Sequence, residues 1–168
     1  MPRINHVKKA RKPIGQCGSC STPIKKGDAY YWLAFRFGGK RVRCSKPECR
    51  FKRSDTTQSK LGDVYSAQET AEELLAKWDR KDQEALVTIV NDCGASVREV
   101  YDDYESSASE HPNLAGQTEE IRSQLDEIAN ELEDFSVDEH DPEAETQEAW
   151  AKRVLGEAES AIERVSEV

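Results

Sequence analysis

Apolar residues recur at helical spacing through the C-terminal two-thirds of the chain, and their pattern predicts four helices. The first helix is expected to begin near residue 64, where Ser66-Ala-Gln-Glu69 has the form of a capping box. The second is expected to run from about Gln83 to Glu105, with Gly94 weakening it locally. Cys93 is predicted to be a small buried hydrophobic residue on this second helix. The apolar stripes of the two helices are Val64, Ala67, Ala71, Leu74, Leu75 and Trp78, and Leu86, Ile89, Val90, Cys93, Val97, Val100, Tyr101 and Tyr104.

Two further helices are predicted after a loop at Ser106 to Asn113. The third helix places its apolar residues at alternating steps of four and three, which is the seam of a coiled-coil-like pairing. In the fourth helix, Asp141 is predicted to be the N-cap and Pro142 the first helical residue. We expect these last two helices to form a hairpin in which residues 136–142 reverse the chain. Their apolar stripes are Ile121, Leu125, Ile128, Leu132 and Phe135, and Trp150, Val154, Ala158, Ala161, Ile162 and Val165.

The N-terminal third has a pattern of strands instead. The segment Ala29 to Phe37 is rich in residues that strands favour, and Gly38-Gly39 predicts a two-residue turn into a second strand at Lys40 to Cys44. The strand aromatics are expected mainly to form a core, with stacking on nucleic-acid bases as the alternative. Residues 2–16 contain two prolines and a glycine and are expected to form a basic arm without regular structure.

Four cysteines in this strand region form two short pairs, Cys17-Gly-Ser-Cys20 and Cys44-Ser-Lys-Pro-Glu-Cys49, separated by 23 residues. A pair two to four residues apart on a tight turn directs both sulfurs at one ion, and the hairpin between the pairs returns the chain to supply the other two. The pattern predicts a structural Zn²⁺ site with no open coordination position. The alternatives are two disulfides, a redox pair at Cys17 and Cys20, or idle thiols. Disulfides are disfavoured without a secretory signal, and the redox pair without a βαβ context.

The predicted fold class is therefore α+β. Residues 1–60 are expected to form a small zinc-bound β-hairpin module with an N-terminal basic arm, and residues 61–168 an all-α body of about four helices in a hairpin or bundle.

Charge divides the chain in the same way, because residues 1–60 contain 16 Lys and Arg against three Asp and Glu, a net charge of +13. The remaining 108 residues have a net charge of −22. The basic part has the charge of a phosphate-binding surface, whereas the acidic part would repel nucleic acid.

The order of features in the N-terminal module resembles the DNA-break-sensing zinc finger of poly(ADP-ribose) polymerases. The shared features are the basic run at residues 7–11, the first cysteine pair, a Lys-Gly-Asp turn at residues 26–28, an aromatic strand, Gly39-Lys40 and the second pair. The module is also similar to small zinc-finger proteins of uncertain role encoded by bacteriophages. In the polymerase finger the second pair is His-x-x-Cys, whereas this chain has Cys44 and Cys49. The resemblance therefore implies metal binding, whereas the departure in the second pair weakens the case for break recognition, and the polymerase activity is not carried over.

These observations lead us to expect a non-enzymatic, zinc-dependent nucleic-acid-binding adaptor. Residues 1–60 are expected to bind DNA, with RNA as the alternative, and the acidic helices to serve self-association or recruitment of a protein. One alternative is an inhibitor or regulator of a host DNA-handling protein that acts through the acidic helices, and another is a structural oligomerisation element. The candidate phosphate contacts are Lys8, Lys9, Arg11, Lys12, Arg41, Arg43, Arg50, Lys52 and Arg53.

Membrane proteins and enzymes are the disfavoured classes. No apolar run approaches the roughly 20 residues of a membrane helix, and the first residues lack a hydrophobic signal core. We therefore expect a soluble protein without a membrane partner, located in the cytoplasm, which is the host cytoplasm if the chain is phage-encoded. The histidines at positions 6, 111 and 140 lie outside any nuclease-like pattern, and no Gly-rich phosphate loop opens a helix.

Overall fold

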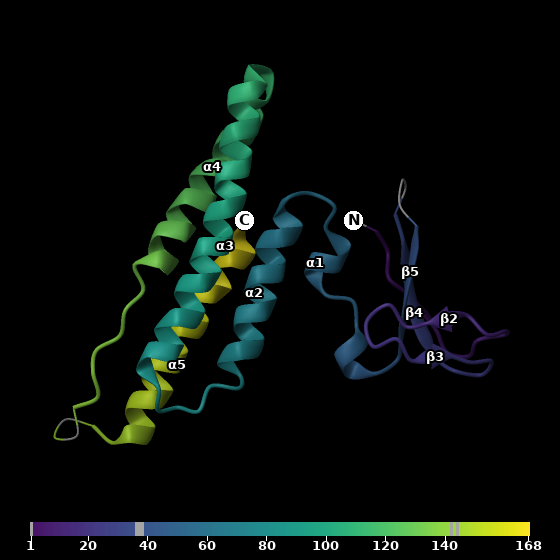
Figure 1. Cartoon of the computed structure of the whole chain (residues 1–168), viewed down its shortest axis with the longest axis horizontal. Helices are drawn as coiled ribbons and strands as arrows, with labels where there is room; N and C mark the ends of the chain where they lie inside the picture. Colours follow the sequence, from purple (N-terminus) through teal and green to yellow (C-terminus); the bar gives the residue numbers. More distant parts are fainter. Residues whose placement is uncertain (1, 36–38, 142, 144) are drawn as a thin grey trace. The chain divides into compact units, whose positions relative to one another are not determined.

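The computed structural model describes residues 2–35, 39–141, 143 and 145–168 and divides the chain into two compact units. We call residues 1–58 the head and residues 59–168 the body. The regular structure of the head is mainly short antiparallel strands, and that of the body is helices (Figure 1), so the predicted α+β fold class is confirmed. None of the helices in the described part of the chain is long and apolar enough to cross a membrane.

The described residues of the head form two small antiparallel sheets. The first has the order β1-β4-β5, with β1 at Asn5–Val7, β4 at Tyr30–Ala34 and β5 at Lys40–Cys44. The second pairs β2 (Gly15–Gln16) with β3 (Pro23–Ile24). A 3-10 helix, η1 (Pro47–Cys49), and a single helical turn, α1 (Arg53–Thr56), follow β5.

The two strands of the predicted hairpin are confirmed, and Ala34 lies opposite Lys40 in their register. The predicted turn at Gly38-Gly39 belongs to the connection between them. Residues 36–38 of this connection lie outside the described residues. The described aromatic rings of the hairpin, at residues 30, 31, 32 and 35, are all buried or half-buried, as their predicted core role requires.

The prediction of an unstructured N-terminal arm is wrong. Residues Asn5–Val7 form β1, which pairs with Tyr30–Trp32 of β4. Ala10 is buried, and its N–H donates to the carbonyl of Asp28 at 2.8 Å while its own carbonyl accepts from the N–H of Gly27 at 2.9 Å. Because β1 has only three residues, its sequence gave too short a pattern to predict a strand.

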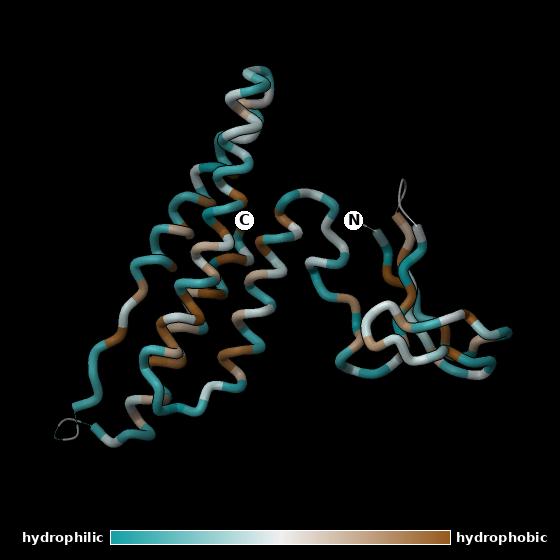
Figure 2. The backbone as a smooth tube through the Cα atoms, viewed as in Figure 1, coloured by the Kyte–Doolittle hydropathy of each residue, from teal (hydrophilic) through white to brown (hydrophobic). Residues whose placement is uncertain are grey.

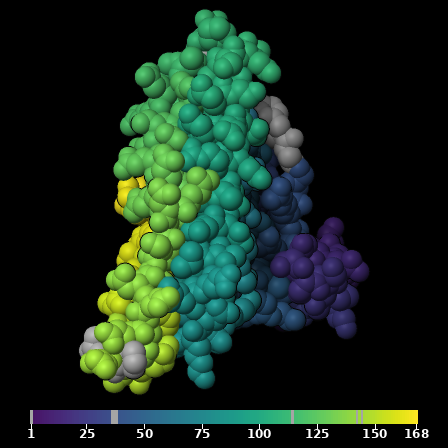
Figure 3. All heavy atoms as spheres, turned by 60° about the vertical axis from the view of Figure 1, so that its left-hand side comes forward, coloured from purple at the N-terminus to yellow at the C-terminus, as the bar shows by residue number. Residues whose placement is uncertain are grey.

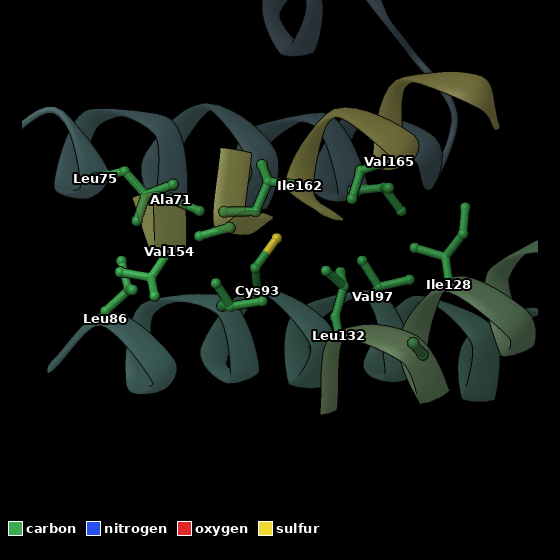
Figure 4. Packing of buried hydrophobic residues seen from close by; sticks show 14 of the residues in the cluster. Ala71, Leu75, Leu86, Cys93, Val97, Ile128, Leu132, Val154, Ile162 and Val165 are labelled. Carbon is green, nitrogen blue, oxygen red and sulfur yellow. The ribbon is translucent and has the colours of Figure 1, made fainter. Parts of the chain in front are cut away.

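Within its described residues, the body contains four α-helices that surround one apolar core. They are α2 (Leu61–Leu75), α3 (Gln83–Glu110), α4 (Pro112–Glu133) and α5 (Gln147–Glu163), with a final 3-10 turn, η2 (Arg164–Glu167). The apolar residues of the helices face one another, and polar residues cover the outside (Figure 2). Cys93 is buried, as predicted, and its side chain points from α3 toward Ile162 of α5 (Figure 4).

Three predicted helix boundaries are wrong. α2 begins at Leu61, so Ser66 to Glu69 lie inside the helix and do not cap it. The predicted loop at residues 106–113 is largely helical, because α3 continues to Glu110 and only His111 separates it from α4. Pro112 occupies the first turn of α4, where a missing N–H costs nothing. Thr146, and not Asp141, is the N-cap of α5, and its hydroxyl accepts from the N–H of Ala149 at 3.3 Å. Pro142 lies outside the described residues.

The helical hairpin of the body is formed by α3 and α4, and not by the last two helices as predicted. These two helices have the most extensive packing in the body, and Figure 3 shows them side by side, α3 in teal and α4 in green. α3 has 28 residues, which span about 42 Å at a rise of 1.5 Å per residue, whereas α2 has 15 residues and α5 has 17. The hairpin therefore extends beyond the ends of α2 and α5 (Figure 1).

Candidate metal centre

The four predicted ligand sulfurs, those of Cys17, Cys20, Cys44 and Cys49, lie within 4.8 Å of one another. In a tetrahedral site with metal–sulfur bonds of about 2.3 Å, neighbouring sulfurs are about 3.8 Å apart. The sulfurs of Cys20 and Cys44 are 3.7 Å apart, which is close to this spacing and far longer than a disulfide bond of about 2.05 Å. All four cysteines are free thiols. The site can therefore hold one metal ion.

The first cysteine pair is positioned by a tight turn after β2. The N–H of Cys17 donates to the carbonyl of Thr22, and the carbonyl of Cys17 accepts from the N–H of Ser21, both at 2.9 Å. Ser21 has a positive φ of 56°, which closes the turn. The N–H of Gly18 donates to the carbonyl of Val42 in β5 at 2.8 Å, and this bond holds the first pair beside the strand that ends at the second pair.

The second cysteine pair spans the end of the hairpin and the 3-10 helix. Cys44 is the last residue of β5, and Cys49 is the last residue of η1, whose first residue is Pro47. Proline fixes φ at this position and favours the tight turn that returns Cys49 toward Cys44. Cys49 is 1% exposed and Cys17 2%, so both sulfurs belong to the core of the head, whereas Cys20 is exposed.

Hydrogen bonds make two of the four thiols easier to ionise. Burial opposes ionisation of Cys17, but backbone N–H groups of Cys20, Cys44 and Ser19 outweigh it, and the pKa of Cys17 is lowered from its ordinary value. The N–H groups of Cys44 and Ser19 lie 3.3 and 3.5 Å from the Cys17 sulfur. The pKa of Cys20 is lowered to about 6, first by the hydroxyl of Thr22, 3.2 Å away, and then by its N–H.

The other two thiols resist ionisation without a cation. Burial raises the pKa of Cys44, and burial together with the neighbouring thiols raises the pKa of Cys49 to about 12. Four thiolates this close would repel one another strongly. A divalent cation at their centre would offset this repulsion, so the arrangement favours a metal-bound state.

Eight of the nine predicted phosphate contacts have exposed side chains, and these residues are Lys8, Lys9, Arg11, Lys12, Arg41, Arg50, Lys52 and Arg53. Arg43 differs because it is half-buried and engaged within the head. Its guanidinium donates to Asp55 at 2.6 Å and to the carbonyl of Arg50 at 2.9 Å, and it lies over the ring of Phe51. Arg43 thus fastens β5 to the segment that follows Cys49.

Three further lysines join this basic surface and were not among the predicted contacts. The hydrogen bonds of Ala10 with Gly27 and Asp28 hold the basic run at residues 8–12 beside the turn that carries Lys25 and Lys26, both exposed. Lys40 lies 4.3 Å from the centre of the Trp32 ring and lines a hollow of about 480 Å³ together with Arg41 and Arg43. The Lys-Lys-Gly-Asp turn was visible in the sequence, but its position beside residues 8–12 depends on tertiary contacts.

Two of the three acidic residues of the head are engaged within it. A carboxylate oxygen of Asp28 accepts from the N–H of Lys25 at 2.7 Å. Asp55 accepts from Arg43 and, at 2.9 Å, from the N–H of Lys52. The third, Glu48, is exposed. The head therefore presents a surface on which positive charge is almost uncompensated.

Comparisons of the chain with protein-family models, with curated proteins and with solved structures found no match. Its function must therefore be inferred from its own residues. The head offers two features for this purpose, a four-cysteine centre that can hold a metal ion and a set of exposed lysines and arginines.

Proposed function

We propose that the chain is a non-enzymatic adaptor whose head, stabilised by Zn²⁺, binds the phosphate backbone of DNA, with RNA as the alternative ligand, and whose acidic body recruits a protein. The observation that carries this proposal is the charge of the head. Residues 1–58 contain 15 Lys and Arg and three Asp and Glu, a net charge of +12. Two of those three acids accept hydrogen bonds within the head, so the positive side chains face solvent with little compensation.

Zinc is the proposed ion because four closely spaced thiolates are the ligand set of structural zinc sites. Cys17, Cys20, Cys44 and Cys49 would hold it, and when bound it would supply a structural cross-link with no position open for chemistry. Cys17 and Cys49 share the small core of the head with Ala10, Ile24 and Tyr30. A core this small is marginal by itself, so the metal would stabilise the surface that displays the basic residues.

Recognition of phosphates without base specificity is the proposed mode of binding. The exposed lysines and arginines come from separate segments and so cover an extended surface. These segments are residues 8–12, the turn at 25–28, β5 and the segment after Cys49. The described aromatic rings of the hairpin are buried or half-buried, which leaves charge as the main source of affinity. Binding through phosphates releases counterions from the nucleic acid, and because added salt reduces the gain from this release, the affinity falls steeply as the salt concentration rises.

The test is fluorescence anisotropy of the zinc-loaded full chain on labelled duplex, nicked and single-stranded DNA and on RNA of the same length, across a salt series. We expect log Kd to rise linearly with log salt concentration and to differ little between sequences. Binding that does not respond to salt, or no binding by zinc-loaded protein, would overturn the proposal.

A matched pair of variants locates the contact. Lys8→Ser/Lys9→Ser removes two exposed charges from the head, whereas Lys77→Ser/Lys81→Ser removes two exposed charges from the body. The head variant should weaken binding about tenfold or more and reduce the salt slope by about two, because each phosphate contact contributes roughly 0.9. The body variant should change neither value. Equal losses would indicate a dependence on net charge alone and would contradict binding by the head.

A further inference from the structure

A groove of about 760 Å³ runs between α2 and α3 on the surface of the body. Its apolar residues include Leu74 of α2 and Ile89 and Val100 of α3. Five acidic residues also line it, and these are Asp63, Asp92, Glu99, Asp102 and Asp103. No lysine, arginine or histidine is among the described lining residues, so the groove combines an apolar surface with negative charge only.

Three arginines of the body form ion pairs outside the groove, and most of the negative charge in the groove has no basic partner within the described part of the chain. Arg98 pairs with Asp126, Arg122 with Glu105, and Arg164 with Glu127, all away from the groove. Of the acids in the groove, Asp103 lies 3.4 Å from Lys60. Within the described part of the chain, the other four have no basic partner. Like charges held along one groove repel one another, and a cationic ligand would relieve that repulsion.

Leu74 supplies an independent sign that the groove is a binding surface. It is 45% exposed, and Ile4 is the only other large hydrophobic residue with comparable exposure in the described part of the chain. Leu74 belongs to the apolar stripe of its helix, and residues of such a stripe are ordinarily buried in the core, as Leu75 is. An exposed apolar residue inside a groove with a charged rim is typical of a protein-docking site.

We propose that the groove binds an amphipathic helix of a partner protein, with the apolar face of that helix against Leu74, Ile89 and Val100 and its lysines and arginines against the acidic rim. The inference gives a location and a chemistry to the recruitment in the proposed function and rests on it. Residues 89–103 of α3 span about 21 Å, which matches a ligand helix of about 14 residues. The rim would repel nucleic acid and the same groove of a second copy.

The experiment uses the zinc-loaded full chain and two labelled synthetic peptides of about 15 residues. Both contain only Leu and Lys in the same numbers; one places Leu at the i, i+3, i+4 and i+7 positions of a helix, and the other is scrambled. We expect the patterned peptide to bind at least about tenfold more tightly, because only it presents an apolar face. Equal binding of the two peptides, or no binding of either, would overturn the inference.

Charge-reversal variants test whether the groove is the site. Asp92→Lys/Glu99→Lys changes two exposed rim residues, and Glu119→Lys/Glu120→Lys makes the same change of net charge at exposed positions of α4 outside the groove. The rim variant should bind the patterned peptide about tenfold or more weakly, and the α4 variant less than about threefold more weakly. Leu74→Ser should also weaken binding about tenfold without unfolding the protein, because Leu74 is exposed. Equal losses from the two charge variants would overturn the inference.

Two further measurements separate the outcomes. Light scattering reports the mass of the full chain, and a dimer that Leu74→Ser dissociates would assign the groove to a second copy and overturn the proposed partner. The unaltered chain is then assayed on labelled DNA. If the unaltered chain binds DNA but not the patterned peptide, this inference alone is removed, whereas if it binds the peptide but not DNA, the proposed role of the head is removed.

Discussion

Gly94 of α3 lies so close to Leu132 of α4 that a Cβ atom on Gly94 would be only 2.8 Å from the Cβ of Leu132. The same atom would be 2.9 Å from the backbone nitrogen of Glu133. The glycine that the sequence marks as a weak point of its helix is therefore the residue that lets α4 pack closely on α3. The cost of glycine in a helix, about 1 kcal/mol, is offset by the contact that it permits.

Gly94→Ala should destabilise the body. The clash involves backbone as well as side-chain atoms, so the two helices must separate, and we expect the free energy of unfolding to fall by about 1–3 kcal/mol. Urea denaturation followed by circular dichroism measures the change. Gly156→Ala in α5 is the matched control, because nothing lies within 4 Å of its added Cβ, and it should leave stability unchanged or raise it by up to about 1 kcal/mol. A Gly94→Ala protein as stable as the control would contradict the close approach.

Metal removal should unfold the head and leave the body folded, because the two units have separate cores. Chelation, or Cys49→Ser, should collapse the dispersion of amide signals from residues 2–58 in an NMR spectrum while helical circular dichroism is retained. Cys93→Ala removes the one cysteine of the body and should leave metal content and head signals unchanged. A head that keeps its dispersed spectrum without metal would show that the ion does not hold the fold.

Metal binding should release at least two protons per ion near pH 7.5. The pKa of Cys49 is raised to about 12 and that of Cys44 is also raised, so both are protonated before the metal enters, whereas Cys20, with a pKa of about 6, is already ionised. Because protons compete with the metal, affinity should fall as pH falls. Isothermal titration calorimetry in buffers of different ionisation enthalpy counts the protons. Release of less than one proton would contradict the raised pKa values of Cys44 and Cys49.

Arg98→Met should weaken the α3–α4 hairpin. The guanidinium of Arg98 donates to Asp126 and, at 2.7 and 3.3 Å, to Asn130 and Glu133, and Asp126 is the main cause of its raised pKa. Methionine keeps the apolar stem and removes these bonds, which in a partly exposed cluster are worth about 1 kcal/mol. Arg153→Met is the comparison, since the side chain of Arg153 is 40% exposed, against 23% for Arg98, and its pairs with Glu145 and Glu157 should contribute less than about 0.5 kcal/mol. Equal losses in urea denaturation would show that bonding to three partners adds nothing.

The core of the body could be predicted from the sequence, whereas several ends of its helices could not. Leu86, Val97 and Val154 are all buried, because apolar residues repeated at helical spacing must face a common core. Only His111 connects α3 to α4. The polar residues around it predicted a longer loop, at residues 106–113, and their pattern did not indicate a connection of one residue. The choice of α3 and α4 as the hairpin depends on close packing at Gly94, which a one-dimensional pattern does not contain.

The candidate metal centre was predictable because its ligands occur as two local pairs, and each pair needs only a short turn. The contacts that surround the centre could not be predicted. The N–H of Gly18 that ties the first pair to Val42, and the pair of Arg43 with Asp55, join residues distant in the sequence. The sequence alone could not show that Arg43 forms an ion pair within the head, and it was therefore predicted to be a phosphate contact like the other basic residues.

The length of α3 has a consequence for the exchange of backbone amide hydrogens with solvent. The residues that α3 contributes to the shared core lie between Leu86 and Val100, and beyond them Ala108 is the one buried residue of this helix in the described part of the chain. The far end of the hairpin is therefore covered by one neighbouring helix only (Figure 1). Its amides should exchange through local fraying of α3 and α4, while those between Leu86 and Val100 should exchange only when the whole body unfolds.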